Sequence, residues 1–171
     1  NYWPDYDDVT RYLSDDNHTV VEKLRKIARE NNMSEAYSYY GGSAILSYQY
    51  KSKPMMSIWL DRLWIEPHLE QKQWIRKIHV RIFGSPRLEY QQNIVKYGED
   101  FVKYFRSHLN YCGCCNPDHV KNLGDIRQVL GKNVRICSDP RGNISNPTTK
   151  DLPYIRKYID LRIEEILAGV R

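Results

Sequence analysis

Apolar residues recur at helical spacing in the stretch HTVVEKLRKIAREN, residues 18–31. A helix has 3.6 residues per turn, so these apolar positions share one face. Asp15, Asp16 or Asn17 can cap the start of this helix, because their side chains accept hydrogen bonds from unpaired backbone N–H groups. Residues 7–13 predict one or two further turns before it. The positions expected to face inward are Val20, Val21, Leu24, Ile27 and Ala28.

After residue 37 the pattern changes to alternation, which is typical of β-strands. Residues 44–50 place apolar and aromatic side chains on one face with a period of two. The next four residues, KSKP, have turn composition, and residues 55–60 resume the extended pattern, so we predict a hairpin. Residues 74–84 alternate again and predict a half-exposed antiparallel strand. The polar face of this strand carries Lys77, His79 and Arg81.

The longest predicted helix begins after this strand. Ser85 is a favourable cap and Pro86 a favourable first helical residue, because the first N–H of a helix has no partner. Apolar spacing carries the helix to Leu109. Gly98 lies inside it and is expected to bend or divide it.

The last third of the chain predicts short elements and then a closing helix. Residues 124–132 predict a short helix that stops at Gly131. Residues 133–137 predict a short strand, and residues 139–149 have the composition of a loop. Residues 150–169 return to helical spacing and predict a final helix.

This order of helices, strands and helices predicts an α+β fold. We expect an antiparallel sheet of three to four strands that is packed by helices on one face. A cysteine-rich loop follows the long central helix. The chain has 171 residues, which is enough for one well-buried core and too few for two comfortable ones. Residues 1–171 are therefore predicted to form a single α+β domain.

Composition indicates a globular protein, with 41% apolar and 27% charged residues. No apolar run approaches the length that spans a bilayer, and the acidic N-terminus does not resemble a secretion signal, so no membrane partner is expected. The net charge of +5 is uneven: residues 1–16 hold five aspartates, whereas residues 51–91 hold eight Lys and Arg. Such a field attracts anions, but it lacks the dense basic stripe of a dedicated nucleic-acid binder, and a solvated surface produces the same pattern.

Three of the four cysteines crowd into the stretch YCGCCNPDH. Cys112 and Cys115 have the spacing of a zinc-ligand pair, and Gly113 lets the backbone turn between them. His119 follows three residues after the pair, and Cys137 ends a predicted strand that can return to the same place. Cys114 is an alternative ligand. The sequence therefore offers Cys112, Cys115, His119 and Cys137 as a candidate structural zinc site.

Two other interpretations of the cysteines remain open. A thiolate just before a helix N-terminus is stabilised by the peptide dipoles, which favours a redox role for Cys112 and Cys115. The strand that precedes such a pair in thioredoxin-like folds is missing. The third interpretation is buried, inert thiols. Because crowded cysteines do not suit a framework of spread disulfides, we expect a reducing compartment and a cytoplasmic protein.

Aromatic residues gather on the predicted sheet. Trp59, Trp64 and Trp74 are expected to line a pocket with Tyr48, and Glu66 lies among them. A carboxylate inside an aromatic wall can hold a flat, cationic small molecule through charge attraction and ring contacts. The same side chains also suit a core between sheet and helices, with Glu66 at a solvated edge.

No motif in the chain dictates a reaction, so whether it is an enzyme stays open. A Gly-rich phosphate loop, a dinucleotide fingerprint and a nucleophile elbow are all missing, which disfavours ATP, GTP and NAD chemistry. We therefore expect a domain that binds a small-molecule ligand or a protein partner, with a candidate zinc clip. One alternative is a thiol redox or metal-dependent enzyme that uses Cys112 and Cys115. The other is a nucleic-acid-binding module in which Lys77, His79 and Arg81 touch phosphates.

Overall fold

The fold comes from a computed structural model of the chain. It describes residues 6–10, 13–40, 43–61, 77–83, 91–108, 125–136 and 142–169. The chain divides into two compact units, residues 1–81 with 144–156 and residues 82–143 with 157–171. The single domain that the chain length suggests stays a prediction.

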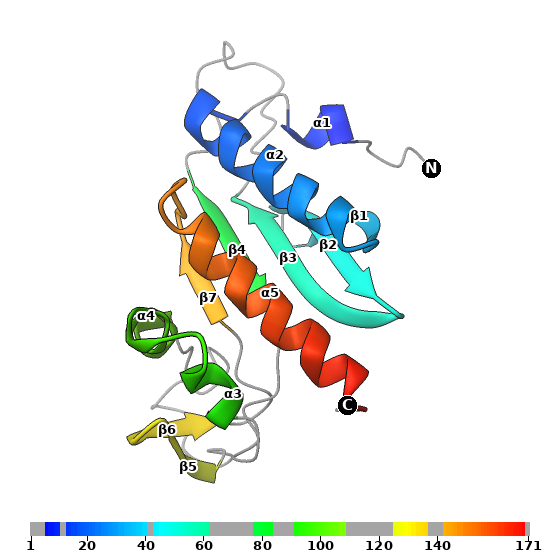
Figure 1. The fold of residues 1–171 in the computed structure, drawn as a ribbon. Coiled ribbons are helices and arrows are strands. Elements are labelled where there is room, and N and C mark those ends of the chain that lie inside the picture. The colour runs from blue at the N-terminus through cyan, green and yellow to red at the C-terminus, as the bar shows by residue number, and fades with distance from the viewer. Residues whose placement is uncertain are drawn as a thin grey trace. The chain divides into compact units, whose positions relative to one another are not determined.

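The first unit is built on a five-stranded antiparallel sheet with the strand order β1-β2-β3-β4-β7 (Figure 1). The α+β class is confirmed, but the predicted count of three to four strands was too low. The extra strand β7 lies in the segment 139–149, which has loop composition, and it joins the sheet through backbone pairing beside β4. The strands are β1 (Ser34–Tyr40), β2 (Ser43–Tyr50), β3 (Lys53–Leu60), β4 (Ile78–Ile82) and β7 (Gly142–Ser145).

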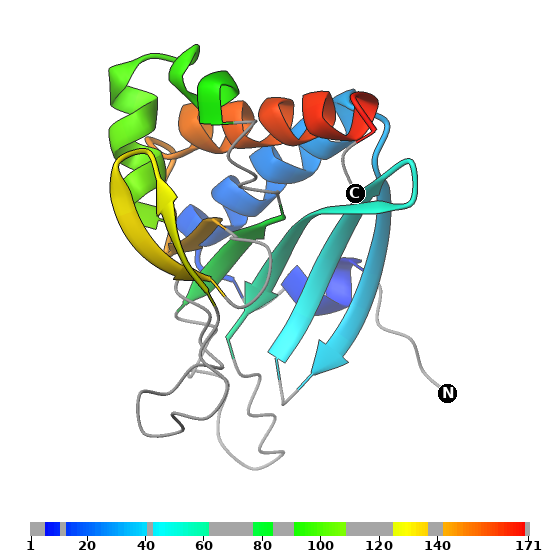
Figure 2. The same cartoon turned by 90° about the horizontal axis from the view of Figure 1, so that it is seen from below.

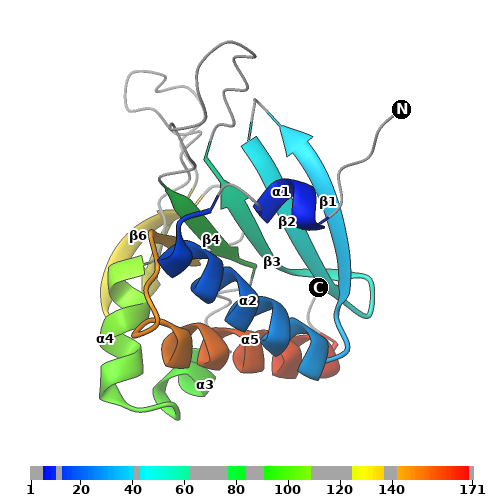
Figure 3. The same ribbon diagram turned by 90° about the horizontal axis from the view of Figure 1, so that it is seen from above.

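Two helices of the first unit, α1 (Tyr6–Thr10) and α2 (Asp15–Glu30), lie on the same side of the sheet (Figure 3). Four of the five α2 positions predicted to face inward are buried, whereas Ile27 is half-buried. The cap is Ser14, whose side-chain oxygen accepts a hydrogen bond from the Asn17 N–H at 3.4 Å, so the helix begins earlier than predicted. Helix α5 (Leu152–Leu167) starts in this unit and confirms the predicted closing helix.

Strand alternation gives this sheet two different faces. Leu46 is paired with Tyr37 on one neighbouring strand and with Ile58 on the other, so these three side chains share the face toward α2. We call it the covered face, and it also carries Glu35, Tyr48 and Met56. The opposite side is called the open face. It carries Ser34, Ala36, Ser38, Tyr40, Ser43, Ile45, Ser47, Ser57 and Trp59.

Tight turns close the hairpins β2–β3 and β5–β6. Lys51 and Ser52 have φ of 48° and 62° between β2 and β3, where the sequence predicts a turn. Leu130 and Gly131 have φ of 49° and 76°, and two successive positive φ values are the geometry of a two-residue hairpin turn. The helix predicted over residues 124–132 is therefore wrong. This segment forms β5 (Asp125–Val129) and its turn, paired with β6 (Lys132–Ile136) in a separate two-stranded sheet, shown in yellow in Figure 2.

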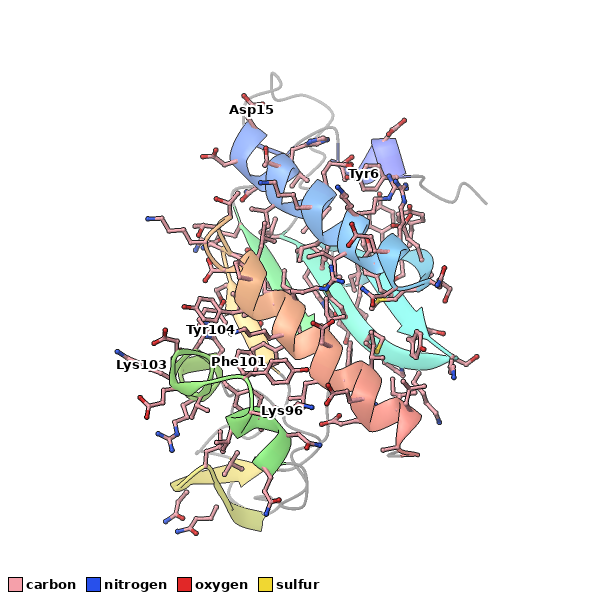
Figure 4. The ribbon with its side chains drawn as sticks, viewed as in Figure 1. Tyr6, Asp15, Lys96, Phe101, Lys103 and Tyr104 are labelled. Atoms are coloured by element: carbon pink, nitrogen blue, oxygen red, sulfur yellow. The ribbon has the colours of Figure 1, made fainter. Side chains whose placement is uncertain are left out.

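In the second unit, Gly98 divides the predicted long helix into α3 (Gln91–Val95) and α4 (Glu99–His108). Gly98 has a φ of 91°, which a residue with a Cβ rarely adopts. Phe101 lies on α4, where Figure 4 labels it, and is fully buried. Its ring lies 5.2 Å from that of Tyr158 and 6.1 Å from that of Phe105, both edge-on. These rings form the aromatic core of the unit.

Candidate functional site

One arginine of α2 connects three elements of the first unit on the covered face. Arg25 donates to the carboxylate of Glu35 on β1 through two bonds of 2.9 Å, from Nε to Oε2 and from Nη2 to Oε1. Its guanidinium also lies 3.6 Å from the ring centroid of Tyr6 on α1, a residue labelled in Figure 4. The Tyr6 hydroxyl donates to Glu22 on α2. The planar guanidinium thus uses its edge for a bidentate ion pair and its face for a cation–π contact.

Two tyrosines complete this network. Tyr37 donates its hydroxyl proton to Glu35 and accepts a bond of 3.3 Å from Arg25 Nη2. Tyr48 is buried, and its hydroxyl has no hydrogen-bond partner among the described residues. Burial, with a smaller effect of the nearby Glu35 carboxylate, raises the pKa of Tyr48. Such a hydroxyl stays protonated in the folded protein.

The pKa values of the network move away from neutrality. Burial alone would raise the pKa of Glu35, but hydrogen bonds from Arg25 and Tyr37 outweigh it and lower the pKa. Burial and the hydrogen bond to Glu35 raise the pKa of Tyr37 to about 12. A general acid or base works best with a pKa near the working pH, so the shifts of these two groups suit structural rather than proton-transfer roles. We therefore assign the network to holding α1, α2 and β1 together.

The open face has a different character. The Arg81 guanidinium lies 4.1 Å from the ring of Trp59, and the Trp59 Nε1–H donates to Ser57 Oγ at 3.0 Å. The ring of Tyr40 stands edge-on to that of Trp59 at 6.1 Å and is 72% exposed. We call Tyr40, Trp59 and Arg81 the aromatic strip. It crosses the sheet from the edge strand β1 to β4.

A polar pair continues the strip toward the other edge of the sheet. His79 Nδ1 lies 3.0 Å from Ser145 Oγ, which joins β4 to β7. His79 and Arg81 alternate with the buried Ile78, Val80 and Ile82, so both belong to the open face. Lys77 precedes β4 and is exposed. The predicted polar face of this strand is therefore present, and it lies beside Trp59.

The second unit contains ion pairs of its own. Glu164 of α5 accepts hydrogen bonds from Lys96 and, at 3.0 Å, from the Tyr97 hydroxyl. Further along α5, Arg162 Nη1 lies 3.1 Å from Glu165 Oε2, and both side chains are buried. The Arg162 Nε is buried without a partner in the described part of the chain. The Glu164 contacts connect α5 to the segment between α3 and α4, and the Arg162–Glu165 pair lies within α5. We assign no chemical role to them.

The structure separates two of the residues that the sequence predicts to share a pocket. Tyr48 lies on the covered face and Trp59 on the open face, because Tyr48 is paired with Met56, three residues before Trp59. The other predicted ligand-binding residues lie outside the described part of the chain. They are Trp64, Glu66 and Trp74.

The candidate zinc ligands also lie outside the described residues, namely Cys112, Cys115, His119 and Cys137. Within the residues that the structure does describe, no three His, Cys, Asp or Glu side chains gather in a way that would hold a metal ion. The zinc prediction is untested by that observation and stays a prediction. Among the described helices, none combines the length and apolar character needed to cross a membrane.

Tyr40 and Ser145 belong to the open-face site but were not predicted. Tyr40 ends the segment SEAYSYY, in which serines and an alanine alternate with Glu35 and tyrosines. That alternation indicates a strand with one small-residue face and could have identified the face of Tyr40. Ser145 carries no comparable signal, since β7 is four residues long and is placed by its pairing.

Comparison of the chain with protein-family models, curated proteins and solved structures finds no significant match.

Proposed function

We propose that the protein is a binding protein whose open face receives a planar aromatic ligand with negative charge, of the nucleotide type. The observation that carries this proposal is the Arg81–Trp59 stack beside the exposed ring of Tyr40. The cation–π contact between Arg81 and Trp59 holds both side chains in place. They therefore lose less conformational entropy when a ligand binds. The Tyr40 ring then offers an apolar surface on which a base can stack.

The charge of the described strands supports an anionic ligand, whereas the cationic ligand first expected depends on Glu66, which lies outside the described residues. Among the strands β1–β4 and β7, the only carboxylate side chain is that of Glu35, which lies on the covered face in its ion pair with Arg25. The open face carries Arg81 and His79, and just beyond the ends of β4 and β3 lie the exposed Lys77 and one carboxylate, Asp61, whose N–H bonds to the Lys77 carbonyl. A phosphate or carboxylate placed there meets positive charge and the Ser145 hydroxyl.

Replacing Tyr40 by alanine should weaken binding of thymidine 5′-monophosphate about 10-fold, since stacking on an aromatic ring contributes about 1–3 kcal/mol per base. Titration calorimetry on the full chain measures the affinity. Tyr39→Ala is the matched control, because Tyr39 is the neighbouring exposed tyrosine but points to the other face. It should change the affinity less than twofold. Equal losses in both variants, or no binding by the unaltered protein, would refute the proposal.

We also propose the zinc clip at Cys112, Cys115, His119 and Cys137 in a cytoplasmic protein, on the basis of ligand type and spacing alone. Metal analysis of protein purified without chelator should find one zinc per chain. Cys112→Ser with Cys115→Ser should abolish it, whereas Cys114→Ser should not if Cys114 is only a neighbour. Metal-free protein from the unaltered chain would remove the clip and leave the open-face proposal intact.

A further inference from the structure

The open-face residues extend across most of the sheet. Tyr40 lies on β1, Trp59 on β3, Arg81 and His79 on β4, and Ser145 on β7. These strands follow the order β1-β2-β3-β4-β7, so four strand spacings separate the first from the last. At about 4.8 Å per spacing, the site is roughly 19 Å long. One mononucleotide cannot contact the Tyr40 ring and the His79–Ser145 pair at the same time.

The side chains of the open face are spread along this length and do not gather at one point. An aromatic pair lies toward one end, and cationic and hydroxyl groups lie toward the other. Serine hydroxyls lie on the same face of β1 and β2, among them Ser38, Ser43 and Ser47. A hydroxyl donates and accepts hydrogen bonds without selecting one partner, which suits a polymer with variable bases and a regular backbone.

We propose that the open face binds single-stranded nucleic acid, with bases on Tyr40 and Trp59 and phosphates near Arg81, His79 and Ser145. This inference rests on the proposed function and extends it from a nucleotide to a chain of nucleotides. Charge complementarity supports it: the open-face strand residues carry no carboxylate, and the chain has a net charge of +5 with a pI near 9.0. Single strands are favoured over duplexes because stacking on Tyr40 requires a base face that is not already stacked on its neighbour in a duplex.

The experiment compares three probes by competition for the full chain at low salt. They are a fluorescein-labelled ten-residue oligothymidylate, a hairpin duplex of ten A·T pairs, and thymidine 5′-monophosphate. The oligothymidylate should bind at least about 10-fold more tightly than either of the others, because it adds a stacked base and further phosphates. Its affinity should fall as salt rises.

Variants assign the binding to the open face. Tyr40→Ala and Arg81→Gln should each weaken the oligothymidylate about 10-fold, and Arg81→Gln should also reduce the salt dependence, because it removes a cation beside the backbone. Tyr39→Ala should bind as the unaltered protein does. Because Tyr40 is mostly exposed, its replacement keeps the fold, and circular dichroism verifies this for each variant.

The outcomes separate the inference from the proposed function. If the mononucleotide binds as tightly as the oligothymidylate and remains sensitive to Tyr40→Ala, the inference is overturned and the proposed function stands. If the duplex binds as tightly as the single strand, the inference is likewise overturned. If no probe binds, both are overturned. If the single strand binds more tightly than the other probes but Tyr39→Ala weakens this binding as much as Tyr40→Ala does, the site lies elsewhere and the inference is overturned.

Discussion

Replacing Glu35 by glutamine should lower the free energy of unfolding at neutral pH by about 2 kcal/mol, as measured by urea denaturation. The substitution keeps the shape of the side chain but leaves the Arg25 guanidinium without its counter-charge in a partly buried place. The exposed fractions of the Arg25 and Glu35 side chains are 16% and 21%. Breaking a fully buried ion pair costs about 3–5 kcal/mol and an exposed one at most about 1 kcal/mol, so an intermediate value is expected.

The chain contains a matched control for this substitution. Arg156 and Glu30 form an ion pair at 2.9 Å, as close as the contact of Arg25 with Glu35, but their side chains are 40% and 45% exposed. Glu30→Gln should therefore cost about 0.5 kcal/mol or less. If Glu35→Gln and Glu30→Gln lose the same stability, the Arg25 network does not hold β1 to α2.

Lowering the pH should reduce the difference in the free energy of unfolding between Glu35→Gln and the unaltered protein. The pKa of Glu35 in the folded protein lies below its ordinary value of 4.5, so the unfolded chain takes up the proton first. The stabilisation by Glu35 is therefore complete above pH 4.5 and is lost as the pH falls through the folded pKa. Denaturation of both proteins between pH 7 and pH 3 would show the two stabilities converging. A constant difference would mean that the charge of Glu35 is not the cause.

Periodicity predicts the elements in which one apolar face is long enough to be unambiguous. Helix α2 and the hairpin of β2 and β3 are of this kind, and both are found where the spacing places them. Residues 124–132 are too short for such a decision, since Ile126, Val129 and Leu130 fit a helical turn as well as a strand. The positive φ values of Leu130 and Gly131 are those of a hairpin turn. The segment forms a strand because it pairs with β6, and periodicity alone does not reveal that pairing.

The functional surface is harder to predict, because it depends on strand register. Trp59 and Tyr48 are both aromatic and lie close in sequence, which makes them resemble two walls of one pocket. One position of offset along a strand moves a side chain to the other face, and the pairing of Tyr48 with Met56 places it opposite to Trp59. Arg81 meets Trp59 only because β4 follows β3 in the sheet. Composition carries no information on either point.

Replacing Phe101 by alanine should have the largest effect on stability, lowering the free energy of unfolding by about 3–5 kcal/mol. Phe101 is fully buried, and its ring packs at 5.4 Å against Tyr97 as well as against Phe105 and Tyr158. Alanine would leave a cavity that these rings cannot fill without losing their edge-to-face contacts. Phe101→Leu keeps most of the volume and should cost less than half as much. Val95→Ala, at a position 57% exposed, should change the stability by less than about 0.5 kcal/mol.

Phe101→Ala and Glu35→Gln together test whether the chain is one domain, because they lie in different compact units. The boundaries between the units fall inside β4, β7 and α5, so three continuous elements contribute residues to both. A strand or helix loses its hydrogen bonds cooperatively, and we therefore expect one unfolding transition that both variants shift. Circular dichroism and tryptophan fluorescence should report the same midpoint in each protein. Two transitions, one moved by Phe101→Ala and the other by Glu35→Gln, would contradict the single-domain prediction and define two independent folding units.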